Sequence, residues 1–278
     1  MVNNSFFVFN ISLIAFFDRK KGDLDKVVSS HCIYFCGIKT RKMEKQTSTK
    51  QSVRIQTSIL NGVEKKALLW LAERQPKWVS SDMLTFIGFL GAVVIAVGFI
   101  LSNYNVHFLW LVCLGFVINW YGDSLDGTLA RFRHQQRPIY GFYLDHTIDA
   151  INEALMFMGT GLSPFMRFDL SCVLLVVYLM LTLNVSINAH LKNEFKLTYA
   201  KLGPTELRLI CIIANIMLIF VKPMQTFVWE IPLLGSTLTM YILDVVGLVV
   251  LLVLIIIYFV EIIQDIRYYA KIDPKKAR

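Results

Sequence analysis

The sequence predicts an all-α, polytopic membrane protein with six transmembrane helices, preceded by an N-terminal interfacial amphipathic helix. Three observations support this fold class. Charged residues make up only 17% of the 278 residues and apolar residues 55%, whereas a soluble domain carries roughly 25% charged residues. The mean hydropathy is +0.55. Six apolar segments approach or exceed the roughly 20 residues that a helix needs to cross the hydrocarbon core.

The first predicted element is a helix over residues 60–75. Apolar side chains follow one face of this segment, at Ile59, Val63, Ala67, Leu68 and Leu71. The charged side chains lie largely off that face. Periodicity alone fits an ordinary surface helix equally well. The position directly before the first apolar segment favours a helix that lies in the membrane interface.

Six predicted spans follow, at residues 84–102, 105–122, 142–162, 170–190, 205–221 and 239–263. The sixth is longer than the hydrocarbon core and has to tilt or protrude. The odd-numbered loops hold only Arg167 and Lys222 as basic residues, and the other loops and the tail hold many more. The positive-inside rule therefore places both termini in the cytoplasm, and we expect a bacterial inner membrane. The net charge of +8 suits anionic lipid and phosphate better than nucleic acid.

The most informative motif lies between the second and third spans. Residues 123–149 follow the pattern D-x2-D-G-x2-A-R-x9-G-x3-D-x3-D. Charge at the edge of a bilayer is costly, so such a cluster marks a functional site. If the end of the second span is helical, Asp123, Asp126, Gly127 and Ala130 share one face. Asp145 and Asp149 share a face of the next helix, and the two helices form a hairpin in which all four acids can converge.

Four uncompensated carboxylates in one place would repel one another, and divalent cations would relieve that repulsion. Carboxylate oxygens suit Mg²⁺ or Mn²⁺. Such a metal site can clamp a diphosphate during phosphoryl transfer. Arg131 can pair with phosphate oxygens, and the small residues Gly127 and Ala130 allow close approach to the backbone. A carboxylate that is not fully committed to metal can serve as the base for a hydroxyl nucleophile.

This pattern resembles the signature of the CDP-alcohol phosphatidyltransferases, and the segment Ser81–Gly88 is similar to the start of their first helix, with Ser81 where proline is common. The resemblance covers residues 77–190 best. It implies a homodimer that uses Mg²⁺ or Mn²⁺ to move a phosphatidyl or similar group from CDP-diacylglycerol or another CDP-alcohol to a small alcohol acceptor, releasing CMP. It assigns metal binding to Asp123, Asp126, Asp145 and Asp149, and the general base to Asp149. The residues assigned to the CDP group are Asp123, Gly127, Ala130, Arg131 and Gly141.

Arg208 opens the fifth predicted span and has two interpretations. Its long side chain can extend to the water interface while its stem stays in lipid. In related enzymes that use phosphorylated acceptors, basic residues at this place look like part of the acceptor site. The resemblance therefore implies acceptor binding by Arg208.

Three other interpretations of the acids stay open. The acids can form a salt-bridged clasp with Arg131, Arg133, Arg137 and His134. An intramembrane prenyltransferase also binds a diphosphate through aspartates and Mg²⁺, but usually has two well-separated aspartate motifs. A transporter can use acids as a cation or proton path, although these acids cluster at one membrane face.

We divide the chain into an N-terminal extension (1–59), a membrane domain (60–265) and a basic cytoplasmic tail (266–278). The apolar run Phe6–Phe17 is too short to span and is followed by basic residues, whereas a signal peptide carries them before its apolar run. Our hypothesis is that translation begins at Met43, or that residues 1–42 are poorly ordered and dispensable.

Overall fold

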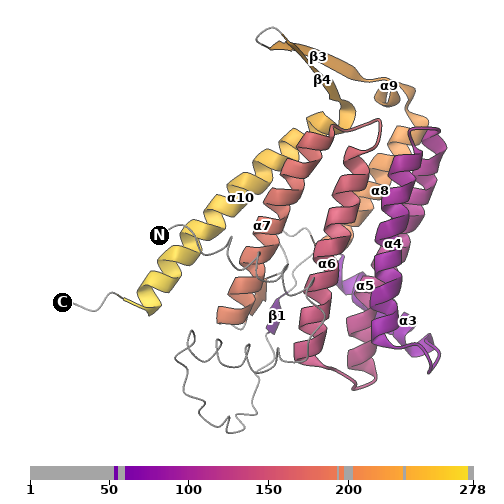
Figure 1. Ribbon diagram of the computed structural model, residues 1–278. Helices are drawn as coiled ribbons and strands as arrows, with labels where there is room; N and C mark the ends of the chain where they lie inside the picture. Colours follow the sequence, from indigo (N-terminus) through magenta and orange to yellow (C-terminus); the bar gives the residue numbers. More distant parts are fainter. Residues whose placement is uncertain (1–52, 56–59, 193, 197–202, 234–235, 275–278) are drawn as a thin grey trace, which may run out of the picture. The chain divides into compact units, whose positions relative to one another are not determined.

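The computed structural model describes residues 53–55, 60–192, 194–196, 203–233 and 236–274 (Figure 1). All of them belong to the unit Lys50–Arg278. The expectations for residues 1–42 therefore lie outside the described residues. The helices are α3 (Asn61–Arg74), α4 (Ser81–Leu101), the short 3-10 helix η1 (Val106–Phe108), α5 (Leu109–Phe132), α6 (Pro138–Gly161), α7 (Phe168–Lys192), α8 (Pro204–Phe220), α9 (Lys222–Gln225) and α10 (Ile242–Ile272). The strands are β1 (Val53–Ile55), β2 (Glu194–Lys196), β3 (Val228–Leu233) and β4 (Ser236–Tyr241).

Four of the described helices are long and apolar enough to cross a membrane: α4, η1 with α5, α7 and α10. They match the first, second, fourth and sixth predicted spans. The third and fifth predicted spans are also helical, as α6 and α8. However, α8 has only 17 residues, and α6 carries three carboxylates along its apolar sequence. The count of six spans therefore stays a prediction.

The long helices form a continuous series of neighbours. Helix α5 packs against α8 and α4, α4 packs against α6, α6 against α7, and α7 against α10. In Figure 1, α6 accordingly lies between α4 and α7. The two helices of the predicted α5–α6 hairpin are thus held together largely by their contacts with α4. Its two helices are linked by residues 133–137, but within the described chain each of them packs most extensively on α4.

Glycines allow α4 and α5 to approach at backbone distance. A Cβ atom added to Gly91 would lie 2.4 Å from the backbone nitrogen of Asn119, and one added to Gly122 would lie 2.2 Å from that of Gly88. Asn119 also donates from Nδ2 to the Gly88 carbonyl oxygen at 2.9 Å. Small residues at helix contacts are the usual way to pack helices closely in lipid. The closely packed pair α4–α5 therefore forms a platform, and the motif begins near the end of its helix α5.

Helix α3 lies against this platform, as a helix at the predicted place. Its Leu68 and Ala72 are buried with Val79, Leu125 and Leu129 in one apolar cluster. Its Val63 and Trp70 are exposed, and Arg74 stacks over the Trp70 ring at 4.0 Å. The buried face shows why the helix forms here. Its predicted contact with the lipid interface stays a prediction.

Both ends of the sixth predicted span differ from the prediction. Residues 228–241 contain an antiparallel hairpin in which Val228 pairs with Tyr241 and Leu233 with Ser236. Helix α10, which corresponds to the sixth predicted span, therefore begins at Ile242, after the hairpin. It continues to Ile272, through part of the predicted tail. Asp244 fixes its start, because its carboxylate accepts from the backbone nitrogens of Arg167 at 2.8 Å and Tyr241 at 2.7 Å. Strands β1 and β2 pair in parallel.

Candidate functional site

The motif lies on the end of helix α5 and the start of helix α6. Helix α5 continues without a break through Asp123 to Phe132, so the predicted helical conformation of this part of the motif is confirmed. The chain reverses at residues 133–137, where His134 has a positive φ of 54°. Helix α6 then starts with Pro138 in its first turn, a position where the missing N–H of proline costs nothing.

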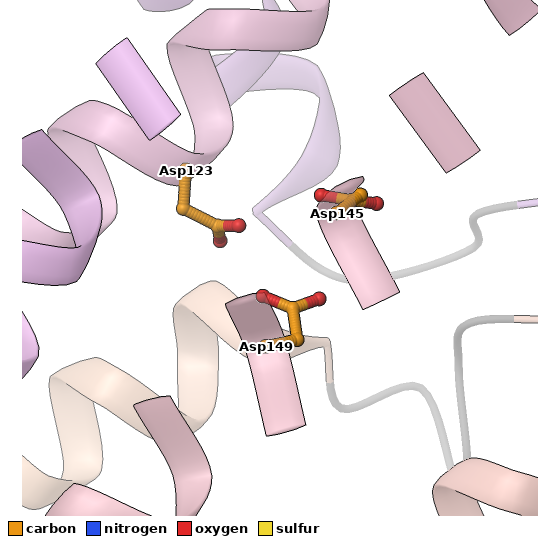
Figure 2. Close-up of side chains that lie close together, drawn as sticks. All are labelled: Asp123, Asp145 and Asp149. Atoms are coloured by element: carbon orange, nitrogen blue, oxygen red, sulfur yellow. The ribbon is translucent and has the colours of Figure 1, made fainter. Parts of the chain in front are cut away.

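Three motif acids converge between these helices. Asp123 comes from α5 and Asp145 and Asp149 from α6, and Figure 2 shows their carboxylates around a common space. One oxygen atom from each lies within 4.8 Å of the others. Asp145 and Asp149 reach the same space because they are one helical turn apart.

The fourth acid, Asp126, lies outside this group of three. Its Oδ2 accepts a hydrogen bond from the Thr85 hydroxyl at 2.6 Å, and its Oδ1 accepts from the Gly127 backbone nitrogen. Ser81 donates to the Asp126 carbonyl oxygen at 2.9 Å. The prediction that all four acids converge is thus met by three of them. The first turns of α4 hold the fourth, which the sequence motif did not indicate.

The three carboxylates fit a divalent cation. Mg²⁺ binds oxygen at about 2.1 Å, so opposite ligands around one ion are about 4.2 Å apart. Neighbouring ligands around one ion are about 3.0 Å apart, so three oxygens within 4.8 Å of one another can bind one ion after side-chain rotations that bring them closer. Hard oxygen donors without sulfur or imidazole suit Mg²⁺ or Mn²⁺. The residues that could hold such an ion are therefore Asp123, Asp145 and Asp149.

Arg208 supplies a cation to the same group. Its Nη2 lies 2.5 Å from Oδ2 of Asp123, and the two side chains are only 17% and 24% exposed. Helix α8 begins at Pro204 and carries Arg208 in its first turns. The contact places the guanidinium at the site acids and therefore argues against a side chain that merely extends to the water interface.

Two of the basic residues considered for the salt-bridged clasp, Arg133 and Arg137, contact other groups. Arg133 donates to the carbonyl oxygens of Gln75, Pro76 and Val79, at 3.1, 2.9 and 2.5 Å. Arg137 pairs with Asp82, with its Nη2 2.5 Å from Oδ2. A hydrogen bond to Asp82 raises the pKa of Arg137. For Arg133 and Arg137 the clasp interpretation is therefore wrong. Arg133 instead binds the segment that leads into α4, and Arg137 binds the first turn of α4.

The residues assigned to the CDP group lie beside the acids. A Cβ atom at Gly127 would lie 3.3 Å from Nη1 of Arg131, and one at Gly141 would meet nothing within 4 Å. Arg131 also donates to the Thr128 hydroxyl at 3.1 Å and its side chain is exposed, as is Gly141. Gly127 thus lets the guanidinium lie against the helix, and Gly141 borders open space. Ala130 lies on the same helix at intermediate exposure.

Sequence reasoning missed two groups near the site. Ser81 and Thr85 hold Asp126, and their spacing of four residues at the start of α4 could have indicated a shared face. Glu153 continues the line of Asp145 and Asp149 along α6 by one further turn. One of its carboxylate oxygens is buried without a hydrogen-bond partner among the described residues.

Comparison with known proteins agrees with this geometry. The family model for CDP-alcohol phosphatidyltransferase matches residues 78–270, more than half of the chain. The phosphatidylinositol phosphate synthase of Cutibacterium acnes is 38% identical over 86 residues, which is 30% of this chain and 38% of that protein. The archaetidylinositol phosphate synthase of Pyrococcus horikoshii is 32% identical over 98 residues, 35% of this chain and 49% of that protein.

Each similarity to an individual relative thus spans less than half of that relative's length, whereas the family match includes α4 through most of α10. All the motif residues and Arg208 lie within it. The chain therefore belongs to the CDP-alcohol phosphatidyltransferase family.

Proposed function

We propose that this protein transfers a phosphatidyl group from CDP-diacylglycerol, or the corresponding group of a similar CDP-alcohol lipid, to an inositol phosphate, and releases CMP. Its family and its four apolar helices make it an integral membrane transferase of phospholipid biosynthesis. The observation that carries the finer proposal is the group formed by the Asp123, Asp145 and Asp149 carboxylates together with Arg208.

The donor is proposed to lie along the motif face of α5 and the start of α6. Arg131 would pair with phosphate oxygens of the CDP group, and Gly127, Ala130 and Gly141 would leave room for it. The open space beside Gly141 supports this assignment, because a side chain there would project toward the ligand. The lipid tails of the donor would remain in the bilayer.

Asp123, Asp145 and Asp149 would hold one or two divalent cations, and Asp126 would contribute from its position beside Thr85. A bound Mg²⁺ or Mn²⁺ would neutralise the diphosphate charge and the charge that develops on the leaving phosphate. Arg208 already balances part of the negative charge of this group, which supports a site that is built for a cation and an anionic substrate together.

The proposed reaction is a single displacement at phosphorus. The acceptor oxygen forms a bond to the lipid-linked phosphorus, the bond between that phosphorus and the CMP oxygen breaks, and CMP leaves with the electron pair. The hydroxyl proton passes to a carboxylate oxygen of Asp149. A base is needed because an inositol hydroxyl is barely ionised at neutral pH.

An anionic acceptor is supported by Arg208. The Cutibacterium and Pyrococcus relatives are named for inositol phosphate lipids, and a guanidinium can bind a phosphate through two parallel hydrogen bonds. In the proposed complex Arg208 would turn from Asp123 toward the acceptor phosphate while metal takes its place at Asp123. We further propose a homodimer in a bacterial inner membrane with this site facing the cytoplasm.

The decisive experiment measures CMP release by the purified protein from CDP-diacylglycerol with an acceptor panel of inositol phosphate, inositol, glycerol phosphate and serine. Mass spectrometry identifies the lipid product. We expect turnover with inositol phosphate only, loss of turnover in excess chelator, and recovery with Mg²⁺ or Mn²⁺. Turnover with another acceptor would overturn the acceptor assignment, and full turnover in chelator would overturn the metal site.

The same assay separates the rival functions. A prenyltransferase would consume a prenyl diphosphate and release diphosphate instead of CMP. A transporter would release neither product. Absence of CMP release with every CDP-alcohol and acceptor, by a protein that is folded and contains metal, would therefore contradict the proposed function.

A further inference from the structure

We propose that Glu64 on α3 is a positioning residue, which holds Arg208 at Asp123 by fixing the first turn of α8. This inference rests on the proposed cation site, because it concerns which cation occupies Asp123. Glu64 lies outside the sequence motif and outside the matched family region of residues 78–270.

Glu64 connects the two helices that supply the Arg208–Asp123 ion pair. Its Oε1 accepts a hydrogen bond from the Thr205 hydroxyl at 2.5 Å and another from Nε1 of Trp120 at 3.1 Å. Thr205 lies three residues before Arg208 on α8, and Trp120 lies three residues before Asp123 on α5. Three residues correspond to about 4.5 Å along a helix axis. The bridge through Glu64 is therefore about one turn from the ion pair on each helix.

A second contact joins α3 to the same turn of α8. Glu206 accepts from the backbone nitrogen of Leu60 at 2.9 Å and from that of Gly203 at 3.0 Å. Leu60 directly precedes α3, and Glu206 is buried. The start of α3 and the start of α8 are thus tied at two places, so the first turn of α8 cannot shift without breaking both contacts.

Helix α3 is itself fixed to the motif helix. Leu68 and Ala72 are buried against Leu125 and Leu129 of α5. Farther along, Gln75 donates to the Tyr121 hydroxyl at 2.6 Å. Helix α3 can therefore act as a brace between α5 and α8, and Glu64 is the side chain through which the brace contacts both helices.

The brace affects metal binding through Arg208. A guanidinium 2.5 Å from Asp123 competes with a metal ion for that carboxylate. Release of Arg208 should therefore tighten metal binding. Removal of the negative charge of Glu64 acts in the opposite direction, because it makes the region less attractive to a cation. The sign of the change thus separates a positioning role from a general charge effect.

The test measures Mn²⁺ binding to the full-length protein in detergent, by electron paramagnetic resonance of free Mn²⁺. We expect Arg208→Ala to lower the Mn²⁺ dissociation constant by roughly two- to fivefold, the range for a partly screened ion pair. Glu64→Ala and Thr205→Val should lower it in the same direction, by no more than Arg208→Ala. In the Arg208→Ala protein, Glu64→Ala should cause no further decrease.

Three control variants accompany the test. Two keep the hydrogen bond between residues 64 and 205, and the third removes a different acid from α3. Glu64→Gln retains a carbonyl oxygen as acceptor, and Thr205→Ser retains the hydroxyl, so both should bind Mn²⁺ without the tightening that Glu64→Ala and Thr205→Val cause. Glu73→Ala removes an acid from the exposed face of the same helix and should have no such effect either. Unchanged binding in both Glu64→Ala and Thr205→Val, or an equal decrease with and without Arg208, would overturn the inference.

A double-mutant cycle on thermal unfolding gives a second readout that needs no metal. The four proteins are the wild type, Glu64→Ala, Arg208→Ala and the double variant. Non-additive changes in the midpoint are expected if the two side chains act through one contact network. Additive changes would overturn the inference. Failure of the wild type to bind Mn²⁺ would instead contradict the proposed cation site, and the unfolding cycle would still decide the role of Glu64.

Discussion

At the scale of single residues, the three grouped acids have different neighbours. Asp123 is held by Arg208, and Asp145 and Asp149 lie one turn apart on α6. Asp126 is held by Thr85 at the start of α4. A carboxylate already engaged by a cation is a weaker proton acceptor. In the proposed complex a metal ion would replace Arg208 at Asp123, so Asp123 would stay engaged by a cation and Asp149 remains the proposed base.

We predict that Asp149→Asn lowers kcat by about 10²- to 10⁴-fold, the usual contribution of a general base, while the protein still binds CDP-diacylglycerol and metal. Asparagine keeps an oxygen ligand but cannot take the proton. Stopped-time CMP release and equilibrium binding of CDP-diacylglycerol measure the two properties. The control is Asp169→Asn, since Asp169 pairs with Arg167 in the α6–α7 region. Activity within a few-fold of the wild type would show that another group is the base.

A second prediction at this scale concerns Arg208. Arg208→Ala should raise the KM for inositol phosphate and leave the KM for CDP-diacylglycerol little changed, because only the acceptor is proposed to contact this guanidinium. Arg74→Ala is the control, since Arg74 stacks on Trp70 at the exposed side of α3. Initial rates with each substrate varied in turn give both constants. Unchanged constants for both substrates would remove Arg208 from the acceptor site.

At the scale of elements, the close contact between α4 and α5 positions the motif. Backbones that touch at Gly91 and Gly122 bring the start of α4 close enough for Ser81 and Thr85 to hold Asp126. Helix α3 packs against the end of α5 through Leu68 and Ala72, in the same apolar cluster as Leu84 of α4. The motif helix is thus supported by elements that carry none of the motif residues.

We predict that Gly91→Ala destabilises the protein by about 1–3 kcal/mol, the usual cost of overpacking. Its new Cβ atom would lie 2.4 Å from the Asn119 backbone nitrogen. The matched control is Gly62→Ala in α3, where a Cβ atom would meet nothing within 4 Å. That change should be neutral or stabilise by up to about 1 kcal/mol, because alanine is the better helix former. Unfolding in detergent measures both, and equal effects would contradict the close α4–α5 contact.

At the scale of the whole molecule, the described chain exposes many large apolar side chains on its long helices, among them Phe86 on α4, Val176 on α7 and Leu252 on α10. In water such a surface would aggregate, whereas in a bilayer it contacts lipid tails. The loops at the two ends of the helices differ in charge: the α5–α6 connection holds Arg133 and Arg137, and the α4–α5 connection around Tyr104 holds no basic residue apart from histidine.

This asymmetry predicts the orientation in the membrane. In a variant without the native cysteines, Tyr104→Cys should react with a membrane-impermeant maleimide in intact cells, because the α4–α5 loop is expected outside. Gln135→Cys should react only after the cells are permeabilised, because the α5–α6 loop is expected in the cytoplasm. Both positions are exposed. The reverse pattern of labelling would contradict the orientation and the cytoplasmic site.

The sequence by itself determined the features that depend on neighbours along the chain. The period of the α-helix is enough to place Asp123, Gly127 and Ala130 on one face of α5, and to place Asp149 one turn after Asp145. Apolar length is enough to identify α4, α5, α7 and α10 as candidate spans. The family resemblance followed from the same local spacing.

Only the tertiary structure decided the contacts between segments far apart in the sequence. Asp126 turned to Thr85 instead of joining the other acids, Arg208 reached Asp123 across 85 positions, and Glu64 reached Thr205 across 141. The hairpin at 228–241 also occupies part of a predicted loop and the first three residues of the sixth predicted span. Each of these outcomes depends on which helix faces pack together and how closely the backbones approach. That packing is set by the fit of many side chains at once, so no local pattern specifies it.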